Sequence, residues 1–197
     1  MSVTSICNMA LANIGKASAI ANIDEQSAEA RACKTYYDVQ RKALLQSYPW
    51  SFAERIASLA ALTTNDRDEL WAYAYARPAG VLKIKRVIAY NDLPRYEHGE
   101  TYAYAGSTIY TNASPAYLEY IDDVQDAGRF PADFEIALSW YLAISIAVPL
   151  TRDIQIRDNA FKMAMVMAAR ASANDANNNP DVGQDDWTDT RLVAARD

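Results

Sequence analysis

Apolar residues recur at the three- and four-residue spacing of an α-helix in four segments of the chain. Polar and charged residues fill the intervening positions, so each segment has the two-sided character of a helix packed on a core. The four predicted helices cover residues 3–14, 27–48, 131–148 and 151–173.

The helix predicted for residues 27–48 has the clearest pattern. Asp24 or Ser27 can cap its first turn, because a short polar side chain there accepts a hydrogen bond from a free backbone amide. Pro49 ends it, because the residue before a proline is disfavoured in helical geometry. Charged residues, including Arg41, occupy the faces outside its apolar stripe.

The last two predicted helices are rich in alanine, which permits close packing between their backbones. We expect Pro149 to end the first of them, because proline cannot donate the next helical hydrogen bond. The second carries one apolar side, formed by Ile154, Phe161, Ala164, Met165, Ala168 and Ala171.

Between the second and third helices the pattern changes to short segments rich in Tyr, Val and Ile and bounded by Gly, Pro or Asn. These features are typical of β-strands, and Ala105-Gly106 between two of the segments predicts a hairpin turn. Both ends of the region lead back into helices, which indicates an inserted β-subdomain. The predicted strands cover residues 71–75, 81–90, 101–105, 107–111 and 116–121.

The predicted fold is therefore α+β and mostly α. We expect a bundle of about four helices from residues 1–70 and 122–179, and a small antiparallel β-subdomain from residues 71–121. Residues 180–197 have no apolar periodicity and contain a single tryptophan, Trp187. We expect them to form an extended C-terminal arm that makes contacts between molecules, with the indole as its buried anchor.

The chain has 197 residues and a net charge of −6, which argues against a general nucleic-acid binder. Such a protein needs surplus Lys and Arg to displace counterions from phosphates. Cys7 and Cys33 are expected to be buried free thiols. No secretory signal is visible, and the apolar run of residues 137–150 is too short to span a bilayer. We therefore expect a soluble protein, made in the cytoplasm, with no membrane partner.

Candidate catalytic and metal-binding residues are few. His98 is the only histidine and is expected to be a surface residue. Two acidic groups, at residues 122–126 and 185–189, could hold Mg²⁺ or Ca²⁺, but their spacing matches no calcium loop, so we interpret them as solvated loop acids. The glycines are never clustered into a phosphate-binding loop. We expect no catalytic residue, no cofactor and no bound metal.

One local stretch reverses the acidic balance, and it contains Arg77, Lys83, Lys85, Arg86 and Arg95. Lys83 and Lys85 alternate along a predicted strand and so share a face. We interpret these charges as protection of an exposed sheet edge against stray pairing. Contact with an acidic partner surface or with DNA phosphate is the alternative.

A set of short segments follows in order along most of the chain: ALANIG at residues 10–15, DEQSAEARAC at 24–33, Tyr37-Asp38 with Arg41, YPWSFA at 48–53, ARPAGVL at 76–82, LEYI at 118–121, FPADFEIAL at 130–138, and Trp187 with Arg191. No single segment is specific. In order and spacing, the whole set resembles the tail tubular protein A family, the head-to-tail adaptors of short-tailed phages. Gly80 departs from the family pattern, in which an acidic residue is expected in this turn.

The resemblance implies a non-enzymatic structural protein of the virion, in its tail or neck. It implies a homo-oligomeric ring, commonly of twelve copies, between the portal protein and the tail nozzle or tube protein, with tail fibres as a further candidate partner. DNA would pass through the lumen without specific binding, which suits an acidic protein. The candidate partner-binding residues are Asp185, Asp186, Trp187 and Arg191 in the arm and Lys83, Lys85 and Arg86 in the basic stretch.

Two other functions stay open at this point. The chain could be a head-completion or stopper protein of another tail type, with a similar helical core and a different partner. It could also be a cytoplasmic enzyme or regulator whose site the sequence does not reveal.

Overall fold

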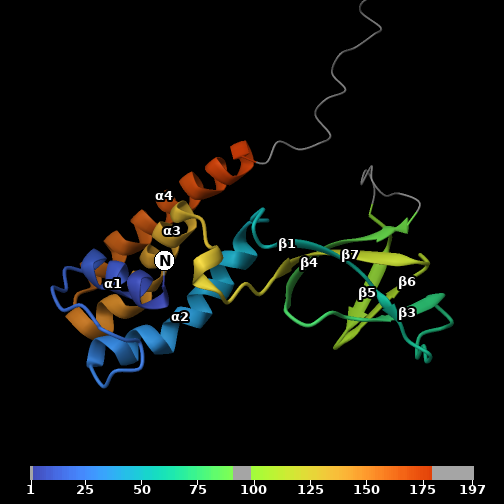
Figure 1. The fold of residues 1–197 in the computed structure, drawn as a ribbon, viewed down its shortest axis with the longest axis horizontal. Helices are drawn as coiled ribbons and strands as arrows, with labels where there is room; N and C mark the ends of the chain where they lie inside the picture. Colours follow the sequence, from blue (N-terminus) through green and yellow to red (C-terminus); the bar gives the residue numbers. More distant parts are fainter. Residues whose placement is uncertain (1, 91–98, 179–197) are drawn as a thin grey trace, which may run out of the picture.

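The computed structural model describes residues 2–90 and 99–178, which form a group of helices and a β-subdomain side by side (Figure 1). The fold is α+β with more helix than strand, which confirms the predicted class. The helices are α1 (Val3–Asn13), α2 (Ala28–Ser47), α3 (Ala132–Thr151) and α4 (Ile154–Asn178).

Helix α3 lies at the centre of the bundle and contacts α1, α2 and α4. Among the described helices, only α3 is long and apolar enough to cross a membrane, but half of that span is buried within the protein. A helix covered by neighbours on several sides needs apolar residues on all of them. The packing of α3 therefore accounts for its composition.

The start of α2 follows from its capping residue. The Ser27 hydroxyl accepts a hydrogen bond from the Ala30 amide at 3.1 Å, so Ser27 is the cap. Asp24, the alternative cap, forms an ion pair with Lys34 at 2.8 Å instead. At its other end α2 stops at Ser47, just before Pro49, as the sequence predicts.

The prediction that Pro149 ends α3 is wrong. Pro149 lies in the last turn of the helix, which continues to Thr151. The turn closes on bonds that need no donor from proline: the Thr151 hydroxyl donates to the Ala147 carbonyl at 2.7 Å, and the Arg152 amide donates to the Val148 carbonyl at 2.9 Å. Arg152 then takes a left-handed conformation, with φ of 59°, and separates α3 from α4.

Five of the six residues predicted as one apolar side of α4 divide between two environments, and the sixth, Ala168, is partly buried. Ala164 and Ala171 are buried, whereas Ile154, Phe161 and Met165 are 59%, 53% and 41% exposed. Alanine allows α4 to lie close against α3, and this contact turns the larger side chains outward. Helix α4 also extends to Asn178, beyond the predicted end at residue 173.

The β-subdomain consists of two antiparallel sheets. The first has the order β1-β7-β4, and the second has the order β2-β3-β6-β5. Gly106, with φ of 56°, lies in the turn between β5 and β6, which confirms the predicted hairpin. The strands are β1 (Glu54–Ser58), β2 (Ala60–Ala61), β3 (Tyr73–Ala76), β4 (Val81–Ala89), β5 (Tyr102–Ala105), β6 (Thr108–Thr111) and β7 (Ala116–Asp122).

Strands β1 and β2 are absent from the sequence prediction, which assigned residues 1–70 to the helical bundle. Strand β1 has the sequence ERIAS, without the run of Tyr, Val and Ile that marks the other strands. It forms through its antiparallel pairing with β7, from Glu54 opposite Ile121 to Ser58 opposite Tyr117. Sheet structure therefore begins at Glu54.

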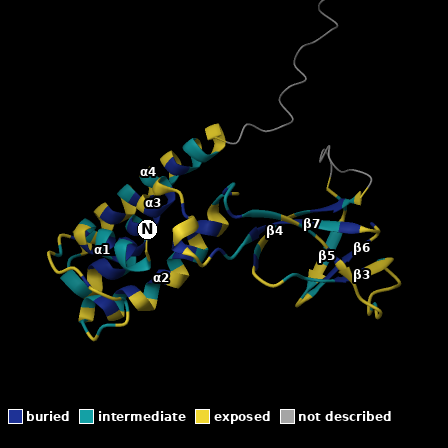
Figure 2. Ribbon diagram, viewed as in Figure 1, coloured by how far each residue is buried: buried dark blue, intermediate teal, exposed yellow. Residues whose placement is uncertain are grey.

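Each part of the molecule has a hydrophobic core of its own. One cluster of buried residues lies among the helices, and a smaller one lies in the β-subdomain (Figure 2). The chain passes from α2 into β1 and returns from β7 to α3 through a short helical turn, η2 (Ala127–Arg129). The arrangement is that of a β-subdomain inserted into a helical bundle.

Candidate functional site

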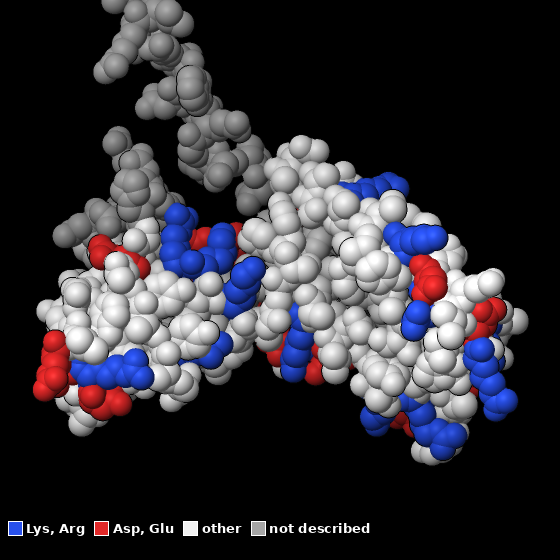
Figure 3. Space-filling model, turned by 180° about the vertical axis from the view of Figure 1, so that it is seen from behind, with Lys and Arg blue, Asp and Glu red and all other residues white. Residues whose placement is uncertain are grey.

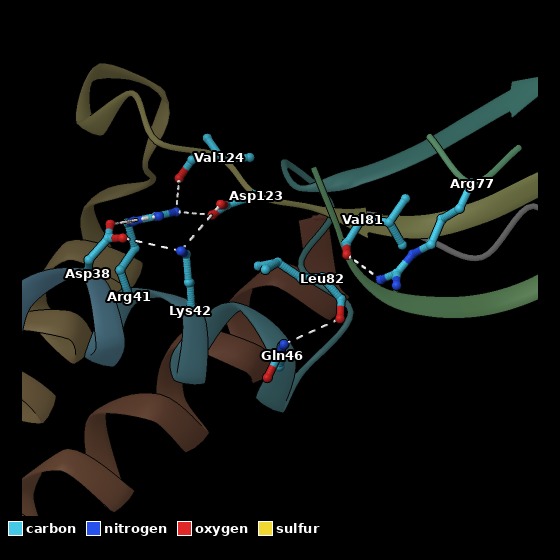
Figure 4. Close-up of polar contacts among 9 residues, drawn as sticks. All are labelled: Asp38, Arg41, Lys42, Gln46, Arg77, Val81, Leu82, Asp123 and Val124. Atoms are coloured by element: carbon cyan, nitrogen blue, oxygen red, sulfur yellow. Dashed lines mark hydrogen bonds and ion pairs between the residues drawn. The ribbon is translucent and has the colours of Figure 1, made fainter. Parts of the chain in front are cut away.

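The place where the chain crosses between the two parts, here called the junction, holds a buried arginine. Arg41 on α2 is 1% exposed. Its guanidinium donates hydrogen bonds to Asp38 Oδ1 at 2.8 Å, to Asp123 Oδ1 at 2.5 Å and to the Val124 carbonyl at 2.7 Å (Figure 4). Asp123 and Val124 directly follow β7, so Arg41 fastens α2 to the chain that returns from the β-subdomain.

The charges at the junction balance one another. Lys42 lies 3.2 Å from Asp38 Oδ2 and 3.8 Å from Asp123 Oδ2, so two cations face two carboxylates. Burial lowers the pKa of Arg41, but hydrogen bonds with Asp123 and Asp38 outweigh it and raise that pKa. The hydrogen bond from Arg41 lowers the pKa of Asp38. Arg41 and Asp38 are therefore held in their charged forms at neutral pH.

Two interpretations from the sequence are wrong here. Arg41 does not lie on an outer charged face of α2 but is buried. Asp123 is not a solvated loop acid, because its side chain is 13% exposed and bound to Arg41. An arginine in a helix is read as a surface residue unless its buried partner is known, and here that partner lies 82 positions away in the sequence.

Further hydrogen bonds join α2 and α4 to the junction. The Gln46 side chain donates to the Leu82 carbonyl on β4, and Lys83 Nζ donates to the Gln46 carbonyl, both at 3.3 Å. The Ser51 amide and hydroxyl donate to the Asp175 carboxylate near the end of α4, at 3.0 and 2.7 Å. The crossing segment is thus fixed to helices on both sides.

Aromatic side chains fill the bundle side of the junction. Trp50 is 2% exposed, and its indole Nε1 donates to the Leu44 carbonyl at 2.8 Å, which confirms the predicted burial of this residue. The Trp50 ring lies 5.1 Å from that of Phe134 in an edge-to-face arrangement. Phe52 and Phe130 complete the cluster, with rings 5.9 Å apart and each 4.9 Å from Phe134.

Two of the three predicted basic residues of β4, Lys85 and Arg86, are bound within the sheet. Lys85 forms ion pairs with Glu119 at 2.6 Å and with Glu54, and Arg86 forms an ion pair with Glu119. An irregularity of the pairing between Ile84 and Arg86 lets neighbouring residues of β4 reach one carboxylate. Strand β4 is an edge of its sheet, as the interpretation of Lys83 and Lys85 requires, but Lys85 and Arg86 serve a structural ion cluster.

The acidic half of this cluster, Glu119 and Glu54, was missed by sequence reasoning. Glu119 on β7 is only 3% exposed. Its burial raises its pKa, but its hydrogen bonds with Glu54, Lys85 and Arg86 outweigh this and lower the pKa to about 2. Burial raises the pKa of Glu54. The available signal was a glutamate between Leu118 and Tyr120 in one strand, together with two adjacent cations in a second strand.

We predict that the protein loses stability as the pH falls from about 5 towards 2. A carboxylate whose folded pKa lies below its ordinary value stabilises the fold above that ordinary value, and the contribution disappears on protonation. The lowered pKa of Glu119 supplies this contribution, and the raised pKa of its neighbour Glu54 offsets part of it. Urea unfolding between pH 2 and 7 measures it. Glu119→Gln should flatten the profile, and the exposed Glu69→Gln should leave it unchanged; equal profiles for both would contradict the prediction.

Several sequence-predicted residues lie outside the described part of the chain. These are Asp185, Asp186, Trp187 and Arg191 of the arm, together with Arg95 and His98. Within the described residues, no group of His, Cys, Asp and Glu is placed to hold a metal ion. Cys7 and Cys33 are free and buried, as predicted.

The turn that precedes β4 favours glycine at position 80. Gly80 has φ of 79°, a conformation that side chains disfavour. A Cβ atom at this position would also lie 3.0 Å from Asp122 Oδ1. An acidic residue here would be strained and would face a like charge. Nearby, Arg77 donates to the Val81 carbonyl at 2.6 Å and closes the turn (Figure 4).

Comparison of the chain with models of protein families finds no match, and comparison with curated proteins finds no significant one.

Proposed function

We propose that the chain is a structural subunit of a phage virion, a head-to-tail adaptor that acts as a ring of identical copies between portal and tail nozzle or tube. In this role the protein carries out no reaction. It supplies two connected parts, a helical bundle and a β-subdomain, each able to contact a different neighbour. The resemblance to the tail tubular protein A family supplies the proposal, and the junction supplies its structural support.

One observation carries the proposal furthest: separate segments of the resemblance meet at the junction. Trp50 and Phe52 of the YPWSFA segment pack on Phe134 of the FPADFEIAL segment. Arg41 of a third segment binds Asp123 and Val124, between the LEYI and FPADFEIAL segments. If the chain shares the fold of that family, segments of the resemblance that are far apart in the sequence are expected to meet in space, as these do at the junction.

The internal use of positive charge supports a channel that does not hold DNA. Lys85 and Arg86 are paired with Glu54 and Glu119, so they do not present unbalanced charge. The net charge of −6 per copy adds up when copies close into a ring, and the field reaches about 8–10 Å at moderate salt. Phosphate would be repelled within that distance.

We therefore predict that the purified protein does not bind double-stranded DNA at micromolar concentration. The measurement is a titration at low and at moderate salt, because phosphate contacts produce a steep salt dependence. The matched variant changes Lys83, Lys85 and Arg86 to Ala, and its melting temperature is measured first, because Lys85 and Arg86 pair with the buried Glu119. Micromolar binding by the natural chain with a steep salt slope, lost in this variant, would place a basic belt in the channel and overturn the prediction.

The experiment that tests the adaptor role is a cross-linking map of the chain with the portal and nozzle proteins of the phage that encodes it. An adaptor is expected to form cross-links to both proteins through separate surfaces. Cross-links to the portal alone would indicate a head-completion or stopper protein. The absence of cross-links to either would contradict the proposal.

A further inference from the structure

The loop between β2 and β3 presents an apolar side chain to solvent on an ordered turn. Leu70 is 75% exposed. The Leu70 and Trp71 amides donate to the Arg67 carbonyl at 3.0 and 2.9 Å, and the Asn65 side chain donates to the Trp71 carbonyl at 2.6 Å. The turn is therefore fixed by its own hydrogen bonds. Residues 66–70 are called the acidic knob below.

The acidic knob is also tied to the sheet beneath it. The Tyr110 hydroxyl donates to Asp66 at 2.6 Å, and the Arg67 guanidinium lies 4.8 Å from the centre of the Tyr110 ring. Asp68 and Glu69 are exposed and have no ion pair within the described residues. A preorganised turn that exposes a leucine beside two free carboxylates has the properties of a binding element, because little ordering entropy remains to be lost.

A complementary surface lies on the outer face of α4. Phe161 and Met165 are one turn apart on it, and Val166 beside them is 58% exposed. Lys162 and Arg170 flank these residues, and the sequence from 160 to 174 contains no acid. Within the described residues Lys162 has no ion pair, and Arg170 approaches Asp133 only at 4.0 Å. These five residues are called the α4 patch below.

The two surfaces match in charge and in apolar character. The acidic knob has three acids and one base, so its net charge is −2. The α4 patch has two cations and a group of large apolar side chains. Exposed apolar groups in a soluble protein mark interaction surfaces when they are contiguous and bordered by charge. The acidic knob therefore offers an apolar side chain beside negative charge, and the α4 patch offers apolar side chains beside positive charge.

One chain cannot bring its own two surfaces together. The β2–β3 loop lies at the end of the β-subdomain away from the bundle, and α4 lies on the bundle (Figure 1). Seen from behind, acidic side chains gather at that free end (Figure 3). The partner for each surface must come from another molecule, and two different complementary surfaces on one chain produce head-to-tail assembly, which closes into a ring or extends as a filament.

We propose that the acidic knob of one copy docks on the α4 patch of the next copy. The inference rests on the proposed ring and assigns its contact between neighbours. Electrostatic attraction would orient the approach, and burial of Leu70 against Phe161 and Met165 would hold the contact. A dimer of two α4 patches would instead bring like charges together.

The test uses two variants, Leu70→Glu and Phe161→Glu. The mass of the assembled particle is measured for each variant by itself and again in the presence of portal rings. Both positions are exposed, so the melting temperature should stay the same. Each variant alone is expected to self-associate at least about tenfold more weakly than the natural chain. A mixture of the two is expected to form a one-to-one complex, because one intact knob and one intact patch remain.

Other results would overturn the inference. If both variants assemble like the natural chain, the two surfaces are not the contact. If Phe161→Glu fails and Leu70→Glu assembles, another surface covers the α4 patch, either a second α4 patch or residues 179–197. Deletion of residues 179–197 separates those two occupants. A natural chain that stays a single copy with and without portal rings contradicts the proposed ring itself.

Charge reversal gives an independent measurement of the same contact. Lys162→Glu alone and the pair Asp68→Lys with Glu69→Lys alone are each expected to weaken assembly. The triple variant restores opposite charges across the contact and is expected to recover most of the association. A triple variant as weak as the two parents would show that these residues do not face one another.

Discussion

Replacement of Arg41 by Met is expected to lower the free energy of unfolding by about 3–5 kcal/mol, the range for removal of one partner from a buried ion pair. The guanidinium is the donor to Asp123 and to the Val124 carbonyl at the junction. Its loss leaves a carboxylate that is 13% exposed with Lys42 at 3.8 Å as its remaining cation. Urea unfolding of the purified protein measures the change.

Lys42→Met is the matched control for this substitution. Lys42 is one position along α2 and contacts the same two acids, but its side chain is 43% exposed. Exposed ion pairs contribute about 0–1 kcal/mol, so the control should cost little. Equal losses for the two variants would show that Arg41 is not the residue that fastens the β-subdomain to the bundle.

Replacement of Trp50 by Ala is expected to cost about 3–5 kcal/mol, as for other buried large aromatic residues. The indole packs against Tyr48, Phe52 and Phe134, and its removal leaves a cavity at the junction. Trp50→Phe keeps most of the contact and loses the hydrogen bond to Leu44, so it should cost less than half as much.

The control for Trp50 is Tyr104→Ala, which removes a side chain that is 60% exposed. Its effect should lie within about 0.5 kcal/mol of zero, as at most surface positions. The melting temperature in a thermal scan is sufficient to rank the variants. An unchanged melting temperature for Trp50→Ala would show that this residue does not support the junction.

Local signals in the sequence were sufficient for most of the helices and strands. The Ser27 cap and the apolar stripe that follows it define α2 without reference to the rest of the chain. The runs rich in Tyr, Val and Ile between glycines and prolines locate β3 to β7, and the Ala105-Gly106 turn joins two of them. These features depend on neighbours within a few positions.

The features that sequence reasoning missed depend on residues far away in the chain. Arg41 is buried because Asp123 and Val124 lie over it, and β1 exists because β7 pairs with it. The large residues of α4 face outward because its alanines make the contact with α3. Amphipathic spacing identified an apolar side of α4, but it could not say which of its residues would contact this bundle and which would stay exposed.

The mass of the assembled particle tests the central claim most directly. The natural chain, measured alone and after addition of the portal ring, is expected to form a closed ring of about twelve copies of the 21.9 kDa subunit, visible as a ring in electron micrographs. A particle that stays at one or two copies at every concentration, and that adds nothing to the portal, would contradict the assignment of this protein as a head-to-tail adaptor.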